Sequence, residues 1–197
     1  MFTTDFLKEA IDAITELDQQ AIESLATSLA WVRDAGGRLF ILGNGGGAGH
    51  ASHAVCDFRK LVGMEAYTFD CVSEITARVN DEGWNSACRK WLEGCRFNMN
   101  DALLVISVGG GDADKNISQN LIEAIGHARY SALGKVFAVV GRDGGYVKEH
   151  SDECVLIQTL SHTTPITEGL QSLILHLLVS HPELAVSEPK WESTCET

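Results

Sequence analysis

Short apolar segments alternate with helical ones along most of this chain, and this alternation constrains the fold more than any other feature. Residues 38–42, 66–69, 102–107 and 136–140 are strongly apolar, and residues 154–158 form a weaker run of the same kind. Apolar runs of this length beside glycine are typical of strands buried on both faces. We therefore expect an α/β fold of three layers, α/β/α, around a mainly parallel five-stranded sheet.

The helical segments between these runs are expected at residues 47–60, 84–97, 118–131, 146–150 and 166–179. Before the first strand, apolar residues recur at three- and four-residue steps, which predicts one long N-terminal helix over about residues 4–35. Its apolar stripe could cover the sheet of its own chain or pack on another subunit. We expect a single domain over residues 1–197, with its core at 36–181 and a surface tail at 182–197.

The amino-acid composition limits the classes of function and of partner that this chain is expected to have. The chain has 15 basic and 27 acidic residues, a net charge of −12, so nucleic acid is not an expected partner. No apolar run approaches the roughly 20 residues that cross a bilayer and the first residues lack a signal-peptide pattern, so we expect no membrane partner and a cytoplasmic location. The six cysteines are far apart and are expected to be reduced and mostly buried: Cys56, Cys71, Cys88, Cys95, Cys154 and Cys195.

Three glycine-rich loops follow the expected strands, at residues 43–49, 107–112 and 141–145. Ligands of open parallel sheets bind beyond the carboxyl ends of the strands, where such loops present backbone amides that suit a phosphate. The first loop also satisfies a dinucleotide fingerprint, Gly43-x-Gly45-x-x-Ala48, with Asp70 as the ribose ligand. A dinucleotide-binding enzyme is therefore one alternative.

Two helices each carry a carboxylate and a histidine. His53 and Asp57 are four residues apart, and Glu168 and His176 are eight apart on an otherwise apolar helix. Taken singly, such a histidine is explained as a core residue, and such an acid as a first-turn residue that the helix dipole favours. Together they could bind a metal or form an acid and base pair. His50 and His162 are interpreted as solvated residues.

The combination of these motifs resembles the sugar isomerase (SIS) domain family, and within it the phosphoheptose isomerase group. The resemblance covers about residues 6–181 and implies a flavodoxin-like fold and a homotetramer with sites at subunit interfaces. It further implies an aldose–ketose isomerase that converts sedoheptulose 7-phosphate to D-glycero-D-manno-heptose 7-phosphate through an enediol. It rests on Leu42-Gly43-Asn44-Gly45-Gly46, His53 with Asp57, Asn80-Asp81-Glu82-Gly83, the Ser107 loop, Gly141-Arg142-Asp143-Gly144-Gly145 and the helix from Glu168 to His176.

The same resemblance assigns roles to individual positions. It implies Asp57 and His176 as the catalytic acid and base, and Zn²⁺ as the cofactor. The metal ligands it implies are His53, Asp57, Glu168 and His176. The substrate contacts predicted around the sugar phosphate are Asn44, Gly45, Gly46, Gly47, Asp81, Ser107, Gly109, Gly110, Lys115 and Ser118.

The sequence departs from the family pattern around the phosphate loops. Gly47 stands where the first loop usually ends in serine, and the loop after Ser107 has few hydroxyls. An apparent insertion at residues 112–117 precedes Ser118, an N-cap candidate, and supplies Lys115 as a phosphate partner. Two further alternatives therefore stay open: a sugar-phosphate-binding protein without catalysis, and an isomerase for a ketose phosphate of another length.

Overall fold

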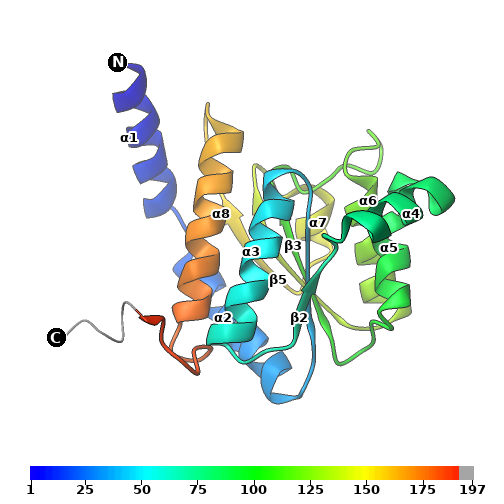
Figure 1. Cartoon of the computed structure of the whole chain (residues 1–197). Helices are drawn as coiled ribbons and strands as arrows, with labels where there is room; N and C mark the ends of the chain where they lie inside the picture. Colours follow the sequence, from blue (N-terminus) through cyan, green and yellow to red (C-terminus); the bar gives the residue numbers. More distant parts are fainter. Residues whose placement is uncertain (191–197) are drawn as a thin grey trace.

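A five-stranded sheet, parallel throughout, lies between two layers of helices in the computed structural model, which describes residues 1–190 (Figure 1). The strand order is β2-β1-β3-β4-β5. This arrangement confirms the predicted fold class, and each strand begins and ends within one residue of its predicted position. The strands are β1 (Leu39–Gly43), β2 (Ala66–Thr68), β3 (Ala102–Ser107), β4 (Lys135–Gly141) and β5 (Glu153–Ile157).

Both faces of the sheet are apolar because successive strand side chains point to opposite sides. Leu39 and Ile41 enter one hydrophobic core, and Phe40 and Leu42 enter the other. The first face is covered by α2 (Gln19–Asp34), α3 (Gly46–Leu61) and α8 (Thr163–Ser180), and the second by α5 (Trp84–Gly94), α6 (Gln119–Gly126) and α7 (Gly145–Glu149).

The N-terminal segment is two helices, so the prediction of one continuous helix over 4–35 is wrong. The first, α1 (Phe2–Thr15), ends before Asp18, whose Oδ1 accepts a hydrogen bond from the backbone N–H of Ala21 at 3.2 Å. This cap starts α2 in a new direction. α2 buries its apolar face against the sheet, whereas α1 buries only Ala13 and projects beyond the body of the molecule (Figure 1).

A single carboxylate ties α1 to the start of α8. Glu9 Oε1 accepts hydrogen bonds from the backbone N–H groups of Leu160, Ser161 and His162 at 2.7–3.0 Å, and Glu9 Oε2 lies 2.8 Å from His162 Nδ1. The side-chain bond to His162, followed by the backbone bonds, lowers the pKa of Glu9 to about 2. His162 is therefore not the solvated residue that the sequence suggested, because it is partly buried and also contacts the ring of Phe6.

Other segments differ from expectation at the surface. The helix α4 (Val72–Glu82) was not predicted, and it buries none of its residues. The helix expected at 118–131 is α6 followed by a π-helical turn, His127–Ser131, and the helix expected at 84–97 ends at Gly94. The predicted surface tail packs at its start, because Leu184 is buried and Val186 N–H donates to the Leu61 carbonyl.

The five cysteines within residues 1–190 are free, but the expectation that most are buried is wrong. Of the five within the described residues, Cys88 is buried, whereas Cys56 and Cys71 are exposed. Cys195 lies outside the described residues. Burial raises the pKa of Cys88 to about 11, so this thiol is a poor nucleophile at neutral pH. In residues 1–190 no helix combines the length and the apolarity needed to cross a membrane.

The bonds of Glu9 make the docking of α1 dependent on pH. The pKa of Glu9 is about 2 in the folded protein against an ordinary value of 4.5. Because the folded value is the lower one, the stabilisation by ionised Glu9 is complete above about pH 4.5 and is lost as the pH falls towards 2. We expect hydrogen-exchange protection of the amides at residues 160–162 to follow that range.

The same amides should lose protection at neutral pH in Glu9→Gln, since a neutral amide is a weaker acceptor for these donors. Glu16→Gln is the matched control, because Glu16 is an exposed acid at the end of α1. Equal protection in the two variants would contradict this account of α1.

Candidate functional site

A small pocket lies at the carboxyl edge of the sheet, between β1 and β3. The chain passes from β1 to β2 on one side and to β3 on the other, and open parallel sheets bind ligands at such a reversal of strand order. The pocket has a volume of about 170 Å³. Five of the predicted substrate contacts meet here, together with Val108: Asn44, Gly47, Ser107, Gly109 and Ser118.

The polar side chains of this pocket are positioned by bonds to the protein. Ser107 Oγ accepts from the Gly110 N–H at 3.1 Å, which leaves the hydroxyl hydrogen of Ser107 free to donate to a ligand. Asn44 exchanges two amide hydrogen bonds with the buried Asn120, at 2.8 and 3.1 Å. Ser118 occupies the predicted N-cap position of α6, but its hydroxyl makes no capping bond.

Close packing explains the glycine at position 47. A Cβ atom on Gly47 would lie 2.7 Å from the carbonyl oxygen of Ile106 in β3. The first turn of α3 therefore approaches the sheet too closely for a serine at this position without a shift of the helix. The serine hydroxyl of the family pattern is therefore excluded at position 47 by contact with the backbone of β3.

The third glycine-rich loop does not offer its helix amides to a ligand. The N–H groups of Tyr146 and Val147, at the start of α7, donate to the carbonyls of Gly111 and Gly110 at 3.1 and 2.9 Å. The expectation that all three loops present free amides is therefore wrong for this loop. Gly110, a predicted substrate contact, instead joins the second and third loops.

The remaining predicted contacts do not line this pocket. The insertion is a small hairpin closed by an antiparallel bridge between Asp112 and Ile117, and Lys115 on it pairs with Asp112 at 2.6 Å. Asp81 is an exposed residue of α4. Gly45 lines a neighbouring pocket of about 150 Å³ that also includes Phe69, Trp84 and Cys88. The alternative ribose ligand, Asp70, accepts a hydrogen bond from Ser52 on α3 at 2.9 Å.

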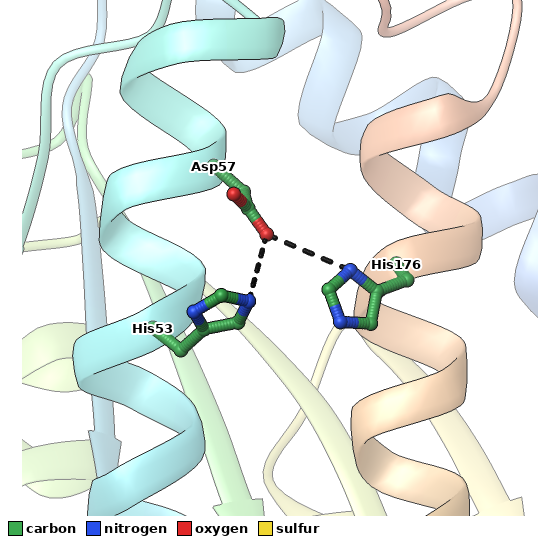
Figure 2. Close-up of side chains that lie close together, drawn as sticks. All are labelled: His53, Asp57 and His176. Atoms are coloured by element: carbon green, nitrogen blue, oxygen red, sulfur yellow. Dashed lines mark ion pairs between the residues drawn. The ribbon is translucent and has the colours of Figure 1, made fainter. Parts of the chain in front are cut away.

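Three predicted site residues meet where α3 and α8 pack side by side (Figure 2). Asp57 Oδ2 lies 3.2 Å from His53 Nε2 and 3.6 Å from His176 Nδ1. The four-residue spacing of His53 and Asp57 puts both on one face of α3, and His176 faces them from α8. The Asp57 side chain is 18% exposed, against 61% for His53 and 53% for His176, so the cluster is open to solvent on one side.

This cluster, His53, Asp57 and His176, has the composition and size of a metal site. Its three ligand atoms lie within 4.8 Å of one another. A tetrahedral ion with bonds of about 2.0–2.1 Å to nitrogen and oxygen separates neighbouring ligand atoms by roughly 3.3 Å, close to the spacings around Asp57 Oδ2. Two imidazoles and one carboxylate, with a fourth position open, are typical of catalytic divalent metal sites.

Glu168, the fourth predicted ligand, is not part of this cluster in the described chain. Its carboxylate packs against Gly46 in the first turn of α3, where a Cβ atom would lie 2.4 Å from Glu168 Oε2. Eight residues along α8 correspond to about 12 Å between Glu168 and His176. The spacing places both residues towards α3 but two turns apart, so the chain joins three of the four predicted ligands.

His50 was interpreted as a solvated residue, but the structure buries part of it. Its Nε2 atom is inaccessible to solvent and has no hydrogen-bond partner within residues 1–190. His50 precedes Asp57 by seven residues on α3, so the two lie on the same helical face. That spacing is the sequence signal that could have placed His50 beside the cluster.

Comparisons with known proteins identify relatives of this chain in sequence and in fold. No family model matches the chain. Proteins named phosphoheptose isomerase match it from Helicobacter pylori strain P12, with 27% identity over 87% of this chain and 85% of the relative, and from Chlorobaculum tepidum, with 28% identity over 86% and 78%. The structure of the phosphoheptose isomerase from Neisseria gonorrhoeae superposes with a TM-score of 0.76 and 26% identity, covering 90% of this chain and 95% of that one.

The chain is similar in sequence and in fold to proteins named phosphoheptose isomerase, which are SIS-domain sugar isomerases. This relationship confirms the resemblance found in the motifs. The fold itself is more widely shared: the Vibrio vulnificus NanR protein, complexed with ManNAc-6P, superposes with a TM-score of 0.62 at 14% identity, covering 93% of this chain and 65% of that one. The fold alone therefore does not separate a catalyst from a binding protein.

The cluster leads to a prediction about metal binding. We expect the protein to bind one divalent ion per chain, detectable with Co²⁺ by the visible absorption of a low-symmetry site. His53→Ala should weaken binding by at least about tenfold, because loss of even an outer-sphere partner of a metal ligand has an effect of that size. His181→Ala is the control, since His181 pairs with Glu23 elsewhere. Equal Co²⁺ affinity in the two variants would rule out the cluster as the site.

Proposed function

We propose that this chain is an aldose–ketose isomerase that interconverts sedoheptulose 7-phosphate and D-glycero-D-manno-heptose 7-phosphate in heptose biosynthesis. The observation that carries the proposal is the convergence of His53, Asp57 and His176 from two helices. The pocket at the strand-order reversal supports it with a place for an anion. The names of the curated relatives support the choice of a heptose phosphate.

The reaction moves a carbonyl from C2 to C1 and needs two proton-transfer groups. One group removes the proton from C1 of the ketose, and the electron pair forms the enediol. The proton returns at C2, while a second proton passes from the C1 oxygen to the C2 oxygen. Asp57 and His176 divide these transfers, and their ligand atoms lie 3.6 Å apart, so both can reach adjacent atoms of one substrate.

The donor set of the cluster fits Zn²⁺, held by His53, Asp57 and His176. When bound, the ion would polarise the substrate oxygens and so acidify the carbon-bound proton. His53 serves only as a ligand in this scheme. Glu168 would join the set only if its carboxylate left Gly46.

The positions of the pocket and the cluster favour an extended substrate. Gly47 in the pocket and His53 in the cluster are six residues apart on α3, which corresponds to about 9 Å along the helix axis. A sugar phosphate that reaches both must therefore carry its phosphate and its carbonyl at opposite ends of a chain of several carbons.

Removal of His176 tests the mechanism directly. We expect His176→Gln to lower turnover by about 10² or more, which is the usual contribution of a general acid or base, with the fold intact by circular dichroism. His181→Gln, a histidine paired with Glu23, should retain normal turnover. Unchanged turnover in His176→Gln would remove this residue from the mechanism.

A substrate panel tests the reaction itself. Ketose phosphates of five to eight carbons are incubated in deuterated water with and without a chelator, and incorporation of deuterium at carbon is followed by NMR. We expect incorporation with the seven-carbon substrate and its loss with the chelator. Incorporation with another length would reassign the substrate, and tight binding without incorporation for every sugar would indicate a sugar-phosphate-binding protein instead.

We further propose a homotetramer with the sites at subunit interfaces. The support is an apolar stripe on α1, where Leu7, Ile11 and Ile14 are spaced four and three residues apart and are 44–61% exposed. Leu173 and Leu177, which flank His176 on α8, are also more than 40% exposed. A second copy of the chain that covers these residues would also enclose the solvent-open side of the cluster.

Assembly can be tested through α1. We expect Ile11→Glu to reduce the sedimenting mass and the turnover together, because it places a charge in the apolar stripe. Lys8→Glu, on the same helix, is the control, since Lys8 is a solvent-facing residue paired with Asp12. A monomeric wild-type protein with full activity would contradict the proposed assembly.

A further inference from the structure

The pocket at the strand-order reversal is polar but carries no charged residue in its lining. Its side-chain donors are those of Asn44, Ser107 and Ser118, and the other lining residues are Gly47, Val108 and Gly109. A phosphate monoester brings up to two negative charges, and the chain as a whole carries −12. Neutral donors supply only partial positive charge, so a full cation close to the pocket would strengthen the binding of a phosphate.

Arg142 is the cation that the geometry offers. It follows β4 directly, and its guanidinium Nη1 lies 3.8 Å from the position that a Cβ atom on Gly109 would take. Gly109 is part of the pocket wall, so the guanidinium lies close to one of the residues that line the pocket, although Arg142 itself is not a lining residue. A Cβ atom at position 109 would be in ordinary van der Waals contact with the Arg142 side chain, so the two residues are close neighbours.

The guanidinium of Arg142 is not committed elsewhere in the described chain. Within residues 1–190 its side chain has no hydrogen bond and no ion pair, in contrast to Arg38, which is paired with Asp101, and Arg129, which is paired with Asp152. The nearby Lys115 is already held by Asp112. A solvent-facing arginine with five unused donors can form a bidentate bond to a phosphate at little desolvation cost.

The backbone at Arg142 is also unusual. Its φ is 56°, in the left-handed region that glycine adopts readily and that other residues rarely adopt. Gly144 and Gly145 in the same loop also have positive φ, so Arg142 is the non-glycine residue among three left-handed positions of this loop. An arginine held in this conformation is a local cost to folding, and such costs are concentrated at functional sites.

We propose that Arg142 is the charged contact for the phosphate of the substrate, and so determines the specificity of the site for phosphorylated sugars. This inference rests on the proposed function for the identity of the substrate. It adds a residue outside the predicted contact set. Arg142 binds the end of the substrate away from the reacting carbons, so its role is in binding rather than in proton transfer.

The first test uses inorganic phosphate as the probe and needs no turnover. Binding is measured by titration calorimetry for the wild type, Arg142→Gln, Arg142→Lys and the control Arg129→Gln. We expect Arg142→Gln to weaken phosphate binding by about tenfold or more, since it removes a charge-assisted bidentate bond. Arg142→Lys should weaken phosphate binding less, because lysine keeps the positive charge but lacks the paired donors of the planar guanidinium. Arg129→Gln should match the wild type.

The second test separates binding from chemistry. With the sugar phosphate, Arg142→Gln should raise KM by about tenfold and leave kcat within a factor of about two. With the unphosphorylated ketose, the wild type and Arg142→Gln should have the same kcat/KM. A fall in kcat with unchanged KM would overturn the assignment of Arg142 to phosphate binding.

The outcomes distinguish this inference from the proposed function. Phosphate binding that depends on Arg142, in a protein that isomerises no sugar of the panel, would support the inference and reject the isomerase. Isomerisation with equal phosphate affinity in the wild type and Arg142→Gln would reject the inference and keep the isomerase. A wild type that binds no phosphate at millimolar concentration would also reject the inference.

Discussion

The approach of the first turn of α3 to the edge of the sheet is the constraint on which the rest of the site depends. A Cβ atom on Gly43 would lie 2.5 Å from the backbone of Gly47, and one on Gly47 would lie 2.7 Å from the Ile106 carbonyl. Only glycine at these positions allows the helix to start so close to β3. This contact fixes the direction of α3 and therefore the face that His53 and Asp57 present to α8.

The candidate site has two parts, a polar pocket at the first turn of α3 and the cluster of His53, Asp57 and His176 further along the same helix. At the carboxyl edge of the sheet, Ser107, Asn44 and Ser118 supply neutral donors. Arg142, whose side chain has no ion pair within residues 1–190, lies close to Gly109 of the same pocket. Further along α3, the cluster concentrates proton-transfer and metal-binding groups. In the proposed function, this separation lets one substrate be held at one end and react at the other, so that binding and chemistry can be changed independently.

Much of the fold could be predicted because burial on both faces of a parallel strand leaves a local signal. The strands were placed within one residue, since each is a short apolar run that no polar face interrupts. The errors fall where no such signal exists. α4 buries nothing, and the break between α1 and α2 depends on a single cap at Asp18. An exposed helix and a single capping hydrogen bond have too little effect on the periodic pattern of apolar residues to be recognised in the sequence.

The sequence by itself determined the layers of the fold, the glycine-rich loops at the strand ends and the helical faces that carry His53, Asp57 and His176, because helix and strand periods are local properties. Only the tertiary structure decided which of these residues meet. It joined His176 to Asp57 and set Glu168 against Gly46, and it used the amides of the third loop inside the protein. It also brought Arg142 close to Gly109 of the pocket wall, because contacts between loops distant in sequence depend on how the layers pack and not on spacing along the chain.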